Sequence, residues 1–156
     1  MNLDELIGQY DFNNRVIVVT GGAGVLCSEM AGALAGCNAS VAVVDREPEE
    51  AERLRNNADF SPERIMILDG DVLQRESMER AAQKILEEWG KIDCLINGAG
   101  GNSRDATTGD ANTFFDLPEE ALRFVSDLNL LGTIIPSQVF GKSMAWQTEG
   151  VILNIS

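Results

Sequence analysis

The sequence predicts an α/β fold, a three-layer, doubly wound sheet of about five parallel strands with helices on both faces. Three observations lead to this prediction. Short β-branched runs alternate along the chain with segments of helical periodicity. These runs are continuously apolar, as strands are when helices cover both of their faces. The first run passes through a glycine cluster directly into a helical pattern, and crossovers of this kind leave successive strands parallel.

Each element follows from its local pattern. A helical spacing of leucine and isoleucine predicts a short helix at residues 2–8, before a turn at residues 11–14. Asn38 stands where a helix end requires the left-handed backbone that asparagine tolerates. Strands are predicted at residues 15–20, 41–44, 64–68, 92–97 and 151–155. Helices are predicted at residues 26–37, 47–57, 78–89 and 117–146, the last opened by a capping box at residues 116–119 and kinked or split at Pro136.

Composition limits the partners of the protein. A chain of 156 residues, 44% hydrophobic and 24% charged, has the size and make-up of one soluble domain. Its formal net charge of −13 argues against nucleic acid or a membrane surface as partner. With no signal sequence and three cysteines in apolar surroundings, we expect a cytoplasmic protein with reduced thiols. The lack of histidine excludes histidine-based acid–base catalysis and most zinc sites, so no metal site is predicted.

The glycine cluster after the first strand predicts a phosphate site. Glycine lets the chain turn tightly and lets its backbone approach a pyrophosphate. The helix that follows points its free N–H groups and positive dipole end at that anion. The pattern alone fits an ordinary glycine-rich turn equally well, so its surroundings must decide. The residues expected to contact the phosphates are Thr20, Gly21, Gly22, Gly24, Val25 and Leu26.

Asp45 ends the second strand roughly 20 residues after the glycine turn, the spacing at which a carboxylate accepts hydrogen bonds from an adenosine ribose. A carboxylate there would repel a 2′-phosphate, which favours NAD over NADP. Arg46 could accommodate such a phosphate, and NADP therefore stays open as the cofactor. The alternative for Asp45 is a solvated loop carboxylate.

Two more segments follow the third and fourth strands. Asp71 either accepts from an adenine amino group or caps a helix. Small residues after the fourth strand lie beside the first strand, at the switch point where open α/β sheets bind ligands, and they would let an adenosine lie flat. Residues 98–116 then form a long polar loop, as functional loops often do. The cofactor contacts predicted here are Asp71, Val72, Asn97, Gly98, Ala99 and Gly100.

Taken in order, four segments resemble motifs of the short-chain dehydrogenases/reductases. Residues 20–27 resemble the Thr-Gly-x-x-x-Gly-x-Gly turn, Asp71 the adenine-contacting aspartate, residues 97–100 the Asn-Asn-Ala-Gly segment, and Asn129 the helix-four asparagine. The resemblance covers essentially the whole chain. It implies a Rossmann-type fold, an NAD(P) cofactor, and hydride transfer between nicotinamide and a carbonyl or alcohol substrate.

Two departures from the family pattern stand out. Val25 and Cys27 occupy the second and third glycine places, so side chains stand where the family lets backbone approach cofactor and strand. Gly98 replaces the second asparagine of the Asn-Asn-Ala-Gly segment. Residues 25–28 and 114–117 also resemble the mannonate or fructuronate oxidoreductase branch, which implies a sugar acid or a polyol-like molecule as substrate.

The resemblance gives Asn129 a catalytic part, because in the family this asparagine supports a proton-relay water through a helix bulge. Its neighbours Leu128 and Leu130 predict that it is buried in the helix. The alternative is a hydrogen bond from helix to loop. The family also uses this helix, residues 117–146 here, for oligomer contacts, so we expect a homo-oligomer.

The family's chemistry needs a Tyr-x-x-x-Lys pair and a serine that orients the substrate. The only tyrosine is Tyr10, with no lysine in the four residues after it, and by the family's register the catalytic serine would follow Ser156. We therefore expect residues 1–156 to be a single NAD(P)-binding domain, truncated before the catalytic segment of a longer oxidoreductase and inactive alone. The alternative is a module that binds the dinucleotide without turnover.

Overall fold

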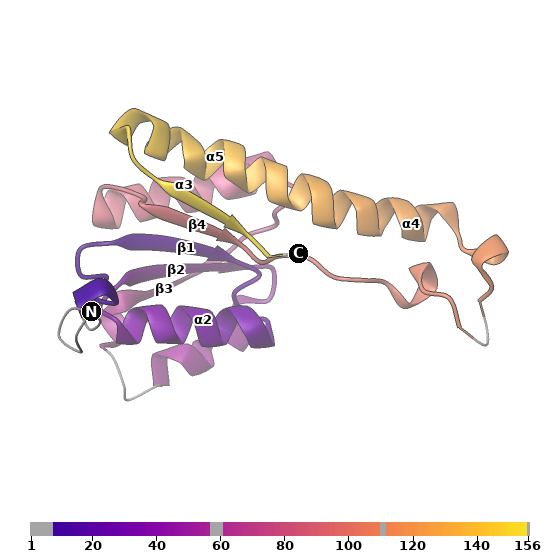
Figure 1. Ribbon diagram of the computed structural model, residues 1–156, viewed down its shortest axis with the longest axis horizontal. Helices are drawn as coiled ribbons and strands as arrows, with labels where there is room; N and C mark the ends of the chain where they lie inside the picture. The colour runs from indigo at the N-terminus through magenta and orange to yellow at the C-terminus, as the bar shows by residue number, and fades with distance from the viewer. Residues whose placement is uncertain (1–7, 57–60, 110–111, 156) are drawn as a thin grey trace.

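The computed structural model describes residues 8–56, 61–109 and 112–155, and it has the predicted doubly wound fold. Five parallel strands form one sheet in the order β3-β2-β1-β4-β5 (Figure 1). The strand order reverses between β1 and β4, which places a ligand-binding switch point at their carboxyl ends. The strands are β1 (Val16–Thr20), β2 (Ser40–Asp45), β3 (Ile65–Asp69), β4 (Cys94–Asn97) and β5 (Val151–Asn154).

Helices cover both faces of this sheet (Figure 1). The α-helices are α2 (Val25–Gly36), α3 (Arg75–Trp89), α4 (Glu119–Ser126) and α5 (Gly132–Gln147). The short 3₁₀ helices are η1 (Pro48–Asn56), η2 (Pro62–Arg64), η3 (Arg104–Ala106) and η4 (Phe114–Asp116). The predicted helix at residues 47–57 is therefore the 3₁₀ helix η1, and all but the last residue of the one predicted at 2–8 lies outside the described residues. In the part of the chain that the structure covers, no helix combines the length and hydrophobicity needed to span a bilayer.

The sheet separates two hydrophobic layers because successive strand residues point to opposite faces. Val16 and Val18 pack with α3 and α5 on one face. Ile17 and Val19 pack with α2 and η1 on the other. This double burial explains why the strands read as continuous apolar runs. The edge strand β5 differs, since all four of its residues are exposed.

The end of α2 was predicted correctly, because Asn38, just beyond the helix, has a left-handed φ of +72°. The capping box was wrong. The Asp116 carboxylate accepts a hydrogen bond from the Thr113 hydroxyl at 2.5 Å, and α4 starts after Pro118 without a side-chain cap. Asp116 belongs to its own 3₁₀ turn, η4, and is therefore not placed to cap α4.

The break in the long helix is also displaced from its predicted position. Pro136 lies inside α5 without ending it. The irregular segment is instead η5 (Asp127–Leu131), a π-helical stretch between α4 and α5 that contains Asn129. A π segment carries one extra residue in a turn, so the helix widens upstream of the proline and continues through it. Figure 1 shows α4 and α5 forming one long rod whose α4 end projects beyond the sheet.

Candidate dinucleotide site

A cavity of about 630 Å³ opens at the carboxyl ends of the inner strands. It brings together most of the residues that the sequence predicted as cofactor contacts. Those that line it are Gly21, Gly24, Val25, Leu26, Asp45, Arg46, Val72, Gly98, Ala99 and Gly100. Lining residues that were not predicted as cofactor contacts include Ala23, Cys27, Glu47, Glu50, Arg53, Gly70, Leu128 and Ile155. Thr20, Gly22, Asp71, Asn97 and Asn129 do not line it.

The turn between β1 and α2 needs glycine where it crosses the sheet. Gly21 has a left-handed φ of +65°, and a Cβ there would lie 2.7 Å from the Ala99 Cα. A Cβ on Gly22 would lie 2.6 Å from Val43 Cγ1. Both contacts are shorter than side chains allow, so the two glycines let the turn pack against β2 and against the loop after β4.

The amino end of α2 is open to an anion. Gly24 is the N-cap and provides no side-chain hydrogen bond, and the first turn of the helix carries no acidic residue. The first N–H groups of a helix have no partner within it, so they attract a negatively charged group. Val25, in the second glycine place, is 80% exposed and is therefore not packed against the sheet.

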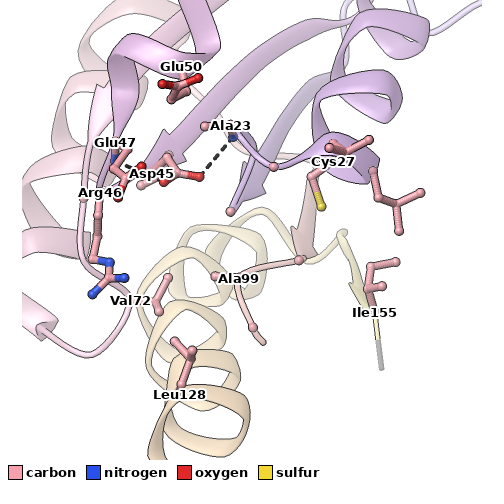
Figure 2. Close-up of a pocket in the computed structure, with 18 of the residues that line it drawn as sticks. Ala23, Cys27, Asp45, Arg46, Glu47, Glu50, Val72, Ala99, Leu128 and Ile155 are labelled. Carbon is pink, nitrogen blue, oxygen red and sulfur yellow. Dashed lines mark hydrogen bonds between the residues drawn. The ribbon is translucent and has the colours of Figure 1, made fainter. Parts of the chain in front are cut away.

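Asp45 is held by two backbone amides. Its Oδ2 accepts from the Ala23 N–H at 3.0 Å, and its Oδ1 accepts from the Glu47 N–H at 3.1 Å (Figure 2). Each carboxylate oxygen has a second lone pair, so the group can still accept from a ligand hydroxyl. Asp45 is thus an ordered, half-buried carboxylate rather than a freely solvated loop residue.

The cavity has a charged end and an apolar end. Figure 2 shows Asp45, Arg46, Glu47 and Glu50 together on one side, and Cys27 and Ile155 on the other. Of the charged side chains that line the cavity, three are carboxylates and two are guanidinium groups, with Arg53 as the second. This end is polar and negatively biased, which suits a sugar with free hydroxyl groups better than an additional phosphate.

Glu50 and Arg53 had a signal in the sequence that was not used. They follow β2 at a spacing of three residues, and side chains three apart lie on the same face of a 3₁₀ helix. The buried residues Ala51 and Leu54 repeat at the same spacing and mark the opposite, sheet-facing side.

Thr20 and Asn97 support the site from beneath. Both are essentially fully buried. The Thr20 hydroxyl accepts from the N–H groups of Gly98 and Ala99 at 3.3 and 3.4 Å, which ties the glycine turn to the loop after β4. The Asn97 amide donates to Ser137 Oγ and to Asn154 Oδ1, both at 2.9 Å. Asn97 therefore fixes β4 against α5 and β5.

Asp71 organises the loop after β3. Its Oδ1 accepts from the Leu73 N–H at 2.9 Å, and its Oδ2 accepts from the Gln74 side chain at 3.3 Å. The N-cap of α3 is Gln74, so Asp71 does not occupy the capping position. The loop it shapes places Val72 at the wall of the cavity (Figure 2).

Two departures from the family pattern meet at one contact. Cys27 is 4% exposed, and a Cβ built on Gly98 would lie 2.2 Å from its Sγ. The thiol occupies the volume that a side chain at position 98 would need. Burial, reinforced by the charge of Asp45, raises the pKa of the Cys27 thiol. Cys27 is therefore a packing residue that stays protonated at neutral pH.

The predicted burial of Asn129 was wrong, because the residue is exposed. Its amide donates to the carbonyl oxygens of Gly101 and Val125, both at 2.8 Å, and its Oδ1 accepts from the Gly101 N–H at 3.2 Å. This is the hydrogen bond from helix to loop that was the alternative. The π-helical position of Asn129 also provides the helix bulge that the resemblance implies.

Comparisons with known proteins agree with this geometry. The family model for short chain dehydrogenases matches residues 15–156. The uncharacterized oxidoreductase UxuB of Bacillus subtilis is 38% identical over 150 residues, which cover 91% of this chain and 54% of that protein. An uncharacterized oxidoreductase of Haemophilus influenzae is 35% identical over an alignment of 161 residues, which covers 97% of this chain and 56% of that protein.

A solved structure from Haemophilus influenzae, described as a D-mannonate oxidoreductase with bound NAD, superposes with a TM-score of 0.85 at 33% identity. The superposition covers 97% of this chain and 57% of the chain in that solved structure. The chain thus spans about half the length of the curated relatives it matches. Because the family model extends over nearly all of the sequence and the fold agrees, the chain belongs to the short-chain dehydrogenase family.

Proposed function

We propose that the cavity binds NAD and that this chain is the nucleotide-binding part of an NAD(P)-dependent oxidoreductase. One observation carries the proposal: the uncapped amino end of α2 and the carboxylate of Asp45 face the same 630 Å³ cavity. These are the two groups that a dinucleotide requires, one for its diphosphate and one for its ribose hydroxyls. The relative described with bound NAD supports this choice of ligand.

The residues present fit the dinucleotide. The glycine turn leaves a space that a Cβ would fill at Gly21, and the helix behind it offers unpaired N–H groups. In this proposal Val72 borders the adenine at the cavity wall, and Asp71 beside it would have to turn its carboxylate from the Leu73 N–H to reach the adenine amino group. Residues 98–100 form the floor beneath the adenosine, with Asn97 supporting them from below. When bound, NAD supplies the hydride-accepting nicotinamide, and the substrate is a carbonyl or alcohol. The relative described as a D-mannonate oxidoreductase favours a sugar acid.

We favour NAD over NADP because of the charge around Asp45. Glu47 and Glu50 line the same end of the cavity, and three carboxylates there disfavour a 2′-phosphate. Arg46 is the group that would bind NADP, if the protein accepts it. Asn129 retains its proposed catalytic part through the π segment, which aims backbone groups away from regular helical hydrogen bonds.

A second candidate function is dinucleotide binding without turnover. The observation that favours it is the position of the only tyrosine, Tyr10, which is 59% exposed and lies outside the cavity lining. Under this hypothesis residues 1–156 form a domain that binds NAD and catalyses nothing, because the family's Tyr-x-x-x-Lys pair does not occur in them.

We also propose a homo-oligomer in which helix 117–146 contacts a second copy. Large apolar side chains along it are exposed, among them Leu130 at 61% and Trp146 at 77%. Contact with another chain would remove this surface from water. Three free cysteines fit a reducing compartment, and we propose the cytoplasm. Light scattering after size-exclusion chromatography tests the association, and a monodisperse monomer would contradict it.

The cofactor proposal is tested by calorimetric titration with NAD and NADP, beside an assay of nicotinamide reduction with sugar acids. We expect NAD to bind more tightly than NADP, and Asp45→Ser to weaken NAD by roughly 10- to 100-fold, as expected for loss of a charged hydrogen-bond acceptor. Asp69→Ser is the matched control, because Asp69 is the strand partner of Asp45 at the end of β3 but is exposed and outside the cavity. A wild-type protein that binds neither dinucleotide would end the proposal. Binding without reduction favours the second candidate.

A further inference from the structure

Arg53 reaches from η1 back to the glycine turn. Its Nη2 donates to the carbonyl oxygen of Ala23 at 3.0 Å and to the Ser28 hydroxyl at 2.8 Å. Ser28 is buried in α2, and Ala23 lies in the turn just before the N-cap. One guanidinium nitrogen therefore connects the turn to the helix that follows it.

The peptide groups of Ala23 are held from two directions. Its N–H donates to Asp45 Oδ2 at 3.0 Å, and its carbonyl oxygen accepts from Arg53. Asp45 is the last residue of β2 and Arg53 lies in η1 after it, whereas Ala23 belongs to the turn after β1. Ala23 stands next to Gly24, the N-cap of α2. The two side chains thus fix the residue that leads into the proposed anion site.

Glycine-rich turns lose more conformational freedom on ordering than other segments do. A ligand that needs such a turn in one conformation binds more weakly if binding must also order it. Side-chain hydrogen bonds that order the turn beforehand remove this cost, and those made by a charged group are the stronger ones. Among the described residues, Arg53 forms no ion pair within 4.0 Å that would compete for its guanidinium.

We infer that Arg53 is a positioning residue for the cofactor, which acts by holding Ala23 and Ser28 so that the glycine turn keeps its binding conformation. This inference rests on the proposed NAD site. It gives η1 a function in the site, because the same 3₁₀ face that carries Glu50 to the cavity carries Arg53 to the turn. A direct contact between the Arg53 charge and the ligand is the competing interpretation.

The experiment compares Arg53→Met, Ser28→Ala and the double variant in the full chain. The matched control is Arg55→Met, since Arg55 is on the same 3₁₀ helix, is exposed, pairs with Glu52 at 3.2 Å, and does not line the cavity. NAD affinity is measured by calorimetry, stability by urea unfolding, and the exchange rate of the Ala23 amide by NMR without ligand.

We expect Arg53→Met to weaken NAD about tenfold, the effect of one charged hydrogen bond, with an unfolding midpoint like that of Arg55→Met. Its Ala23 amide should exchange faster in the absence of NAD. Ser28→Ala should weaken NAD about threefold, and the double variant should bind no worse than Arg53→Met, because both remove one anchor.

Two results would overturn the inference. Unchanged exchange at Ala23 in Arg53→Met would show that the arginine does not hold the turn. Wild-type affinity in Ser28→Ala, together with a loss in Arg53→Met that high salt abolishes, would show a direct charge contact instead. If the wild-type chain binds no NAD, the proposed function fails, and the exchange rate at Ala23 still decides whether Arg53 orders the turn.

Discussion

Gly98→Ala tests the packing between the glycine turn and the loop after β4. The added Cβ would lie 2.2 Å from Cys27 Sγ and 3.0 Å from the Thr20 carbonyl oxygen. Cys27 is short and buried in a helix that packs on the sheet, so it has little room to move. Forcing a group into such a core costs about 1 to 3 kcal/mol, and a contact this short belongs at the upper end. For a chain of this size, the melting temperature should fall by roughly 6 to 12 °C.

The double variant Cys27→Ala/Gly98→Ala identifies the cause. Without Sγ, the nearest cysteine atom to the new Cβ is Cys27 Cβ at 3.7 Å, which is an ordinary contact. The double variant should therefore be more stable than the sum of the single losses predicts, by about 2 kcal/mol. Gly36→Ala is the control, because nothing lies within 4 Å of a Cβ there and a helical alanine should stabilise the fold slightly. Thermal unfolding by circular dichroism is measured for wild type, Gly98→Ala, Cys27→Ala, the double variant and Gly36→Ala. A Gly98→Ala midpoint equal to wild type, or strictly additive losses, would refute the reasoning.

Three further outcomes are expected. Burial alone would raise the pKa of Asp93, but the Val16 amide and neighbouring cations outweigh it and lower that pKa. Asp93→Asn should therefore cost about 1 to 3 kcal/mol at neutral pH. Urea unfolding should show this difference shrinking as the pH falls below roughly 4, where the unfolded chain takes up the proton, and disappearing only once the pH passes the lowered pKa of the folded carboxylate. Cys27, whose pKa is raised by burial, should react with iodoacetamide only after unfolding, as followed by mass spectrometry. Asn129→Ala should speed exchange of the Gly101 amide, which donates to the Asn129 side chain, and unchanged exchange would exclude this tether.

The strands could be predicted within two residues because their signal is local. A strand that is buried on both faces is apolar throughout, and β1 to β4 each end at a polar residue or a glycine-rich turn. The exposed edge strand β5 was predicted from its apolar run alone. Helix ends with one dominant cause were equally predictable, as at Asn38, whose φ is left-handed. The capping box predicted at Asp116 does not form, because Thr113, three residues earlier in the chain, donates its hydroxyl to the same carboxylate.

The candidate site was predictable where one segment determines it. The glycine turn and Asp45 each follow a strand, so their place at the cavity follows from the topology. The spacing of Glu50 and Arg53 indicates that they share one helix face, but only the packing of η1 beside the glycine turn places Arg53 against Ala23 and Ser28. The departures from the family pattern at Cys27 and Gly98 could be seen in the sequence. That the Cys27 side chain fills the space left by the glycine at position 98 could not, since 71 positions separate the two residues and only the parallel pairing of β1 with β4 brings them together.

Asn129 shows what a run of apolar neighbours does and does not indicate. Leucines flank it, and in a helix over a sheet they would be buried and enclose it. Here η5 lies where the long rod leaves the sheet (Figure 1), and Leu130 and Leu131 are 61% and 41% exposed. Leu128 packs against the core, so only Leu130 and Leu131 lie on the surface, where we propose that they contact another chain. If such a contact forms, Asn129 becomes buried with its hydrogen bonds to Gly101 and Val125 already made, and exchange of the Gly101 amide should slow on association. Equal exchange in monomer and oligomer would place the contact elsewhere on the protein.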